Sequence, residues 1–257
     1  MNAPRPGFLR WRSWGSGERR ALLLHGTASS SATWWQVGPA LAEAGWRVKA
    51  PDLPAHGASP RVDSSLTPDL AAAWVATELA DRPVDLVLGH GFGAAVALAL
   101  ISRCRAELVV LEEPPGPVSV DWPTVAEELE RQVAATRRDQ QSAYERLRTA
   151  KPQWAEEGCR AVVPDLAGCV VADVAAGVRA GEGWPTLRPD VPVRPTLVMA
   201  APDAPGVNHG VDETVLRGSD RQLARELADS FVELEGGHNL HRDAPHEWRQ
   251  AVLAFTG

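Results

Sequence analysis

The strongest constraint on the fold is the alternation of short apolar runs with longer segments of helical periodicity. Most of the runs are continuously apolar, which is typical of parallel strands that are buried on both faces of a sheet. The strands are expected at residues 8–14, 21–26, 46–53, 84–90, 107–114, 195–202 and 230–237. Helical segments begin between them, near residues 31, 66 and 93. The pattern predicts an α/β domain with a mostly parallel sheet flanked by helices.

The alternation stops after Pro114 and resumes near Val193. The intervening stretch is helical and charged, and its proline-rich borders read EEPPGP and WPTLRPDVPVRP. Such borders are typical of hinges or loop rims. We therefore expect a core of residues 1–114 and 189–257, and a helical cap, or lid, of residues 115–188, which we call the cap segment.

Charge and composition restrict the partners. The chain has 33 acidic and 26 basic residues and a formal net charge of −7, without an extended Lys/Arg cluster, so nucleic acid is not an expected partner. No run approaches the ~20 apolar residues of a membrane span, and the N-terminus lacks the apolar core of a signal peptide. Cys104, Cys159 and Cys169 fit no zinc or disulfide spacing. We expect a soluble, cytoplasmic protein that binds no membrane, and the oligomeric state stays open.

One short stretch, LGHGFGAAVAL at residues 88–98, joins an expected strand to an expected helix. Its centre, Gly91, carries no side chain. Glycine adopts a positive φ without the steric cost that other residues bear, so a sharp strand-to-helix turn is expected there.

Five segments in order along the chain resemble the α/β-hydrolase superfamily. They are LLLHG followed by Thr27, PDLPAHGASP at residues 51–60, GHGFG, LVMAAPD ending at Asp203, and GGHNLHRDAP containing His238. In that family a Gly-x-Ser-x-Gly elbow, an acid and a histidine follow one another along the chain. The resemblance therefore implies an α/β-hydrolase fold with Gly91 in the position of the nucleophile.

The same resemblance implies roles for the remaining residues. His238 would be a general base and Asp203 the acid that orients it. The backbone amides of Thr27 and Phe92 would form an oxyanion hole, which does not depend on a serine side chain. Glu112 or Glu113, after the preceding strand, are rival candidates for the acid.

Four further side chains are expected to line the substrate pocket. In this family the equivalent of His25 usually orders the oxyanion loop, and His90 adjoins the empty position. Trp34 and Trp35 are expected in the core and the pocket wall. Serines at positions 29–31 are poorly placed to replace the nucleophile.

With Gly91 the acyl-enzyme route is lost, because no hydroxyl is available to attack. We expect an enzyme that acts on a small apolar carbonyl compound, such as an ester or lactone, by general-base chemistry of His238 and Asp203. Neither a metal nor an organic cofactor is implied. Three alternatives stay open: a nucleophile-deleted variant of an ordinary serine esterase or lactonase, a lyase or cofactor-free oxygenase that abstracts a proton, and a non-catalytic binder.

Overall fold

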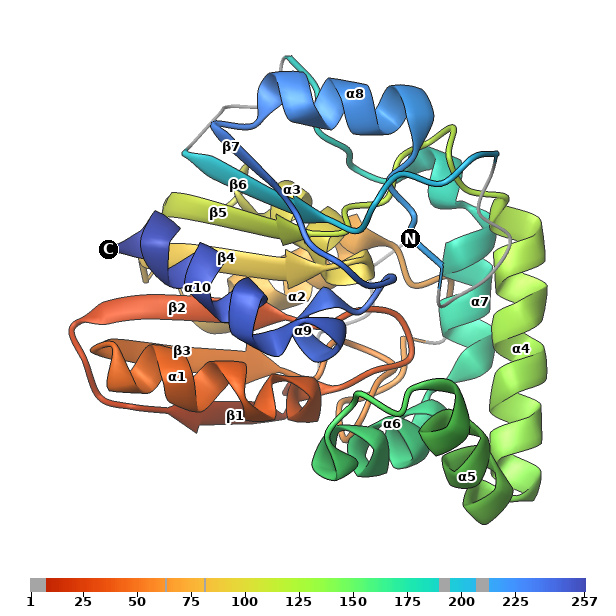
Figure 1. Cartoon of the computed structure of the whole chain (residues 1–257). Coiled ribbons are helices and arrows are strands. Elements are labelled where there is room, and N and C mark those ends of the chain that lie inside the picture. The colour runs from red at the N-terminus through yellow and green to blue at the C-terminus, as the bar shows by residue number, and fades with distance from the viewer. Residues whose placement is uncertain (1–7, 63, 81, 190–194, 207–212) are drawn as a thin grey trace.

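The computed structural model describes residues 8–62, 64–80, 82–189, 195–206 and 213–257. In this part of the chain seven strands form one sheet in the order β1-β3-β2-β4-β5-β6-β7 (Figure 1). The antiparallel strand is β1, at the edge beside β3, and the other pairs are parallel. The strands are β1 (Trp11–Trp14), β2 (Arg19–Leu24), β3 (Trp46–Pro51), β4 (Val84–His90), β5 (Ala106–Glu112), β6 (Thr196–Ala200) and β7 (Ser230–Glu233). The mostly parallel sheet predicted from the apolar runs is confirmed.

The strand order reverses between β2 and β4. From β2 the chain goes to β3 on one side, whereas β5 to β7 follow on the other side of β4. Leu24 pairs with Gly89, so the carboxyl ends of β2 and β4 lie side by side. Ligands in open α/β sheets bind at such a switch point, which places the loop of Thr27 beside Gly91.

Helices cover both faces of the sheet (Figure 1). Leu22 and Leu24 pack in the apolar cluster that includes residues of α2, α3 and α8, whereas Leu23 packs in the cluster that includes residues of α1 and α10. This division follows from the two-residue period of a strand. The helices of the core are η1 (Ser31–Trp35), α1 (Val37–Glu43), α2 (Pro68–Leu79), α3 (Phe92–Leu100), α8 (Gly218–Leu227), α9 (Leu240–Asp243) and α10 (Pro245–Thr256).

The cap segment contributes helices at the carboxyl ends of the strands, toward which the arrows of β4 and β5 point in Figure 1. The long helical stretch after residue 121 is divided at Asp139, whose extended backbone interrupts it. Asp139 caps the next helix, because its carboxylate accepts hydrogen bonds from the amide and the hydroxyl of Ser142. The elements are α4 (Trp122–Arg138), α5 (Gln140–Ala150), α6 (Glu156–Gly168), α7 (Val171–Arg179) and η2 (Gly181–Gly183).

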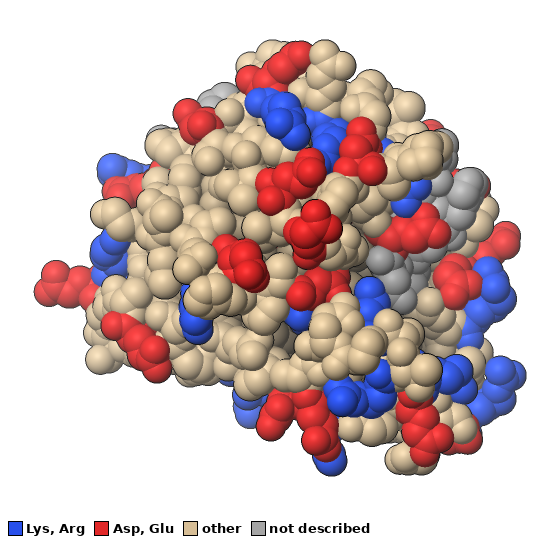
Figure 2. Space-filling view, viewed as in Figure 1, with Lys and Arg blue, Asp and Glu red and all other residues tan. Residues whose placement is uncertain are grey.

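Acidic and basic side chains are interspersed on the face shown in Figure 2. Among the described residues no single helix has the length and apolarity needed to cross a membrane. The successive helices α6 and α7 reach this length and apolarity only when they are taken together, and the chain bends by 90° between them.

Candidate active site

Gly91 forms the sharp turn between β4 and α3. Its φ of +51° and ψ of −115° lie where a side chain is strained, and its amide donates to the Glu112 carbonyl at 2.9 Å. A Cβ atom at this position would lie 2.9 Å from Nε2 of His238 and 3.1 Å from its Cε1. The elbow residue and the expected base are therefore brought together, with the imidazole against the space that Gly91 leaves open.

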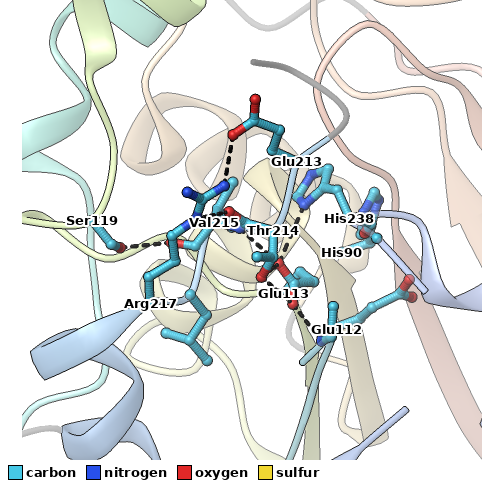
Figure 3. A network of polar contacts seen from close by, with 12 residues as sticks. His90, Glu112, Glu113, Ser119, Glu213, Thr214, Val215, Arg217 and His238 are labelled. Carbon is cyan, nitrogen blue, oxygen red and sulfur yellow. Dashed lines mark hydrogen bonds and ion pairs between the residues drawn. The ribbon is translucent and has the colours of Figure 1, made fainter. Parts of the chain in front are cut away.

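His238 lies on the loop between β7 and α9. Its ring is 4.5 Å from the ring of His90 between centroids, and its carbonyl accepts a hydrogen bond from Nε2 of His90 at 2.9 Å. Nδ1 is buried and has no hydrogen-bond partner among the described residues. An oxygen of Glu113, Oε2, lies 3.7 Å from Nδ1 (Figure 3). This separation is longer than a hydrogen bond, as is often seen in unliganded catalytic sites.

Glu113 follows β5 directly and is fully buried, with a φ of +47°. Its Oε1 accepts from the amide of Ala201 at 2.7 Å, and its Oε2 accepts from the amide of Val215 at 2.8 Å. The hydroxyl of Thr214 lies 2.9 and 2.8 Å from the two oxygens. Both oxygens are thus fixed by donors, and one of them faces His238.

The loop that holds Glu113 is itself braced (Figure 3). Arg217 donates to the Thr214 carbonyl at 2.8 Å and to Glu213 at 2.7 Å. Ser119, in the cap segment, donates to the carbonyl of Val215 at 2.6 Å. The cap segment is therefore joined to the loop that positions the buried carboxylate.

Asp203 lies elsewhere. It is exposed, and its Oδ1 accepts from the amides of Ala204 at 3.0 Å and Gly218 at 3.3 Å. Among the described residues, the carboxylate beside the expected base is Glu113, one of the two rival acids. The signal for it in the sequence was an acid directly after an apolar strand run, in LEEPP.

Two buried histidines order the loop after β2. His25 donates from Nδ1 to the Gly26 carbonyl and accepts at Nε2 from the Leu53 amide, both at 2.8 Å. His56 accepts from the Ala28 amide at 3.0 Å. Burial lowers the pKa of His25 to about 4 and that of His56 to about 3, so both rings are neutral at physiological pH.

The loop ordered in this way contains Thr27, which lines the cavity in front of Gly91 together with Phe92. Phe92 is the first residue of α3, where an amide has no acceptor within its own helix. Both expected oxyanion donors therefore belong to residues at the cavity.

The cavity has a volume of about 540 Å³ and lies between the core loops and the cap segment. Among the expected pocket residues, His90 lines it, whereas His25, Trp34 and Trp35 are not among the described lining residues. Trp34 is fully buried away from the cavity, in the apolar cluster that also contains residues of α1 and α10. The aromatic wall instead comes from the cap segment, whose contribution the sequence reasoning missed: Trp122, Trp154 and Trp184.

A second buried network runs behind the site. Glu112 accepts from the amide and Nδ1 of His241 at 3.0 and 2.8 Å, and from Nε1 of Trp248 at 3.0 Å. The hydroxyl of Thr33 donates to Nε2 of His241 at 2.8 Å and accepts from Nη2 of Arg242 at 2.7 Å. Burial raises the pKa of Glu112 and lowers that of His241. A hydrogen-bonded chain therefore leads from a buried carboxylate to Arg242 in the cavity wall.

Potential metal ligands occur within this network. Ligand atoms of His90, Glu112 and His241 lie within 4.8 Å of one another. However, Nε2 of His90 donates to the carbonyl of His238, and both ring nitrogens of His241 already have partners. The geometry thus favours a hydrogen-bonded support for the loop of His238.

Asp243 connects the cap segment to the same loop. Its Oδ1 accepts from Nε1 of Trp154 at 2.7 Å and from Nε2 of Gln153 at 3.0 Å. Its Oδ2 accepts from the amide of Gly237, next to His238, at 2.9 Å. One buried carboxylate therefore holds both the loop before α6 and the loop that carries His238.

Known proteins resemble this chain over part or nearly all of its length. Lipase LipV of Mycobacterium tuberculosis (strain ATCC 25618 / H37Rv) is 26% identical over 260 residues, which cover 94% of this chain and 95% of the relative. Pimeloyl-acyl-carrier-protein methyl ester esterase of Sodalis glossinidius (strain morsitans) is 34% identical over 125 residues, 47% of each chain. A solved hydrolase from Pseudomonas aeruginosa PA01 has a TM-score of 0.70 and 24% identity, with 100% of both chains covered.

The two relatives are thus a lipase and an esterase, and the solved structure shares the fold of this chain. The sequence model of the alpha/beta hydrolase family matches residues 21–251, which span nearly the whole described structure. The chain therefore belongs to the alpha/beta hydrolase family.

Proposed function

We propose that this protein is an enzyme that hydrolyses a small, largely apolar ester or lactone without a serine nucleophile, with the cap segment as a lid. The main support for this proposal is the position of His238: its Nε2 faces the open space at Gly91, and its Nδ1 faces the buried carboxylate of Glu113. The esterase and lipase among its relatives support the reaction class.

In the proposed reaction a water molecule occupies the space in front of Gly91. Nε2 of His238 takes a proton from this water as the water oxygen attacks the carbonyl carbon. The amides of Thr27 and Phe92 stabilise the oxyanion that develops. The imidazolium then returns the proton to the leaving alkoxide as the carbon–oxygen bond breaks, which yields a carboxylic acid and an alcohol.

We assign the role of the orienting acid to Glu113 in place of Asp203. A buried carboxylate beside Nδ1 selects the tautomer in which Nε2 is free to accept a proton, and it stabilises the imidazolium. Asp203, exposed and bound to two backbone amides, offers neither effect in this arrangement.

Restoring the missing hydroxyl tests the geometry. Gly91→Ser should react with a fluorophosphonate probe and hydrolyse aryl esters, after His238 yields by a few tenths of an ångström to the new Cβ. Gly91→Ala is the matched control, because it adds the same Cβ and the same backbone strain without a hydroxyl. Absence of labelling in folded Gly91→Ser with an open pocket would contradict the assignment of the elbow.

His238→Ala with Gly91 retained separates an enzyme from a binder. Turnover of small esters and lactones, detected by product mass, should fall by about 10²- to 10⁴-fold, the usual contribution of a positioned general base. Affinity should change far less, since the loss of one hydrogen bond from the ring is worth only about 0.5–1.5 kcal/mol. A ligand that binds, stays chemically unchanged and is indifferent to His238→Ala would favour the binder.

A further inference from the structure

The three tryptophans that the cap segment contributes to the cavity differ in the partners of their indole N–H groups. Nε1 of Trp154 donates to Asp243 at 2.7 Å, and Nε1 of Trp184 donates to the carbonyl of Gly177 at 3.1 Å. Nε1 of Trp122 is buried and has no hydrogen-bond partner among the described residues. A buried donor without an acceptor costs free energy, and native structures contain few of them, so this N–H group calls for an explanation.

The ring of Trp122 is held in place by its neighbours. The residue is only 4% exposed. Its ring lies against Gly181, where an added Cβ would clash with the ring atoms Cδ2 and Cε3. The ring centroid lies 4.8 Å from that of Trp184, whose ring is 5.1 Å from the ring of Phe92. A row of three rings therefore leads from the residue after Gly91 to the unsatisfied donor.

A second neutral polar group beside the cavity also lacks a partner. The hydroxyl oxygen of Ser29 is buried and has no hydrogen bond within the part of the chain that the structure describes. Ser29 lies on the loop after β2 in the core, whereas Trp122 belongs to the cap segment, and both residues line the cavity. Ligand cavities typically combine an apolar lining with a few polar groups that orient the ligand. The two unsatisfied groups thus indicate a ligand with polar atoms of its own.

The chemistry of the indole group defines the ligand atom that suits it. An indole N–H group donates and cannot accept, so its partner must be an acceptor such as an oxygen atom. The donor is neutral, and an uncharged oxygen is buried beside it without the large desolvation cost of a charge. Val120, Val125 and Leu129 line the same cavity and suit the apolar body of such a ligand.

We propose that Trp122 donates a hydrogen bond to an uncharged oxygen of the bound ligand, as in a ketone or an ether. Resting on the proposed function, this assignment narrows the substrate class to an ester or lactone with a second oxygen on its apolar body, while the reacting carbonyl lies at His238. Trp122 is then a specificity-determining residue that takes no part in bond breaking.

Para-diacetylbenzene and para-isopropenylacetophenone are suitable probes for the whole protein. Each offers a ketone to the amides of Thr27 and Phe92, and neither contains an ester. They differ in one position, where the second carbonyl oxygen of the former is a CH₂ group in the latter. In proton–nitrogen correlation spectra, the indole proton of Trp122 should move downfield with para-diacetylbenzene, because the N–H group gains an acceptor, and much less with para-isopropenylacetophenone.

Trp122→Phe retains an aromatic ring without the N–H group. It should weaken the binding of para-diacetylbenzene about fivefold more than that of para-isopropenylacetophenone, as expected for one hydrogen bond. Comparison of the two probes cancels the effect of the smaller ring on packing. Trp184→Phe is the matched control, because its N–H group already has an acceptor in Gly177. It should leave the ratio of the two affinities within about twofold.

A thermal melt of each variant verifies the fold. If Trp122→Phe does not fold, the spectrum of the unaltered protein still tests the proposal, because the indole resonance can be assigned through its contact with Gly181. A resonance that does not move downfield at saturation with para-diacetylbenzene would overturn the proposal. So would an unchanged affinity ratio in folded Trp122→Phe, an equal change in Trp184→Phe, or no binding of either probe at millimolar concentration.

The proposed hydrolysis is tested separately. Labelling of Gly91→Ser by a fluorophosphonate requires no second oxygen in the probe, and the two ketones are not hydrolysed. Failure of labelling with the response of Trp122 intact would therefore remove the reaction and leave the ligand site.

Discussion

Glu113→Gln and Asp203→Asn form a matched pair that identifies the acid beside His238. The Glu113 carboxylate is fully buried, and it is the acceptor in each of its described hydrogen bonds. In the glutamine variant, the NH₂ group replaces one of the two carboxylate oxygens. It then faces the backbone amide of Ala201 or of Val215, and the charge-assisted hydrogen bond from that amide is lost. At about 1.5–3 kcal/mol for such a bond, with the misplaced amide added, Glu113→Gln should destabilise the protein by about 2–4 kcal/mol.

Asp203→Asn should have little effect on stability, within about 0.5 kcal/mol, because the side chain is exposed and accepts from two surface amides. Urea unfolding of both variants measures this difference. Activity is measured in the Gly91→Ser background as kcat/KM for an aryl acetate. Glu113→Gln should lower it by about 10²- to 10⁴-fold, and Asp203→Asn should leave it nearly unchanged.

The urea curves also control for unfolding, since activity is expressed per folded molecule. If Asp203→Asn abolishes hydrolysis while folded Glu113→Gln retains it, the assignment of the acid from the contact at 3.7 Å is wrong. Equal losses in the two variants would mean that Asp203 supports the base by a route that the described contacts do not include.

Three further changes are predicted. Burial raises the pKa of Asp165 from 3.8 to about 6, so the ionised carboxylate opposes folding at higher pH. Asp165→Asn should therefore raise the free energy of unfolding in urea by up to about 3 kcal/mol at about pH 8, and by far less at about pH 4. Burial lowers the pKa of His25 from 6.5 to about 4, so its contribution to stability is complete above 6.5 and is lost as the pH falls toward 4; His25→Gln should flatten part of this loss in the same assay. Trp154→Phe removes the donor to Asp243 and should cost about 1–3 kcal/mol, with faster hydrogen exchange at the amide of Gly237, measured by NMR.

The sheet was predictable because strands buried on both faces must be apolar throughout, and this pattern is visible without tertiary information. The helix expected to begin near residue 66 was equally local, since the hydroxyl of Thr67 accepts from the Leu70 amide within the first turn of α2. The division of the cap segment at Asp139 was missed because helical periodicity continues through it.

The site was only partly predictable. Gly91 and His238 are placed by the ends of strands, and the structure brings them together. Asp203 and Glu113 follow neighbouring parallel strands at the same edge of the sheet, so the sequence leaves both within reach. The left-handed backbone of Glu113 and the donors from the loop at Val215 favour one of them, and both depend on tertiary contacts.

The shared carboxylate of Asp243 limits how this protein can be recombined with its relatives. A chimaera that receives a foreign segment between α5 and α6 would lose the donors Gln153 and Trp154 unless the graft supplies equivalents. An uncompensated carboxylate would then remain beside Gly237, on the loop that carries His238. An exchange of the cap segment should therefore retain Gln153 and Trp154, so that the loop of His238 keeps its support.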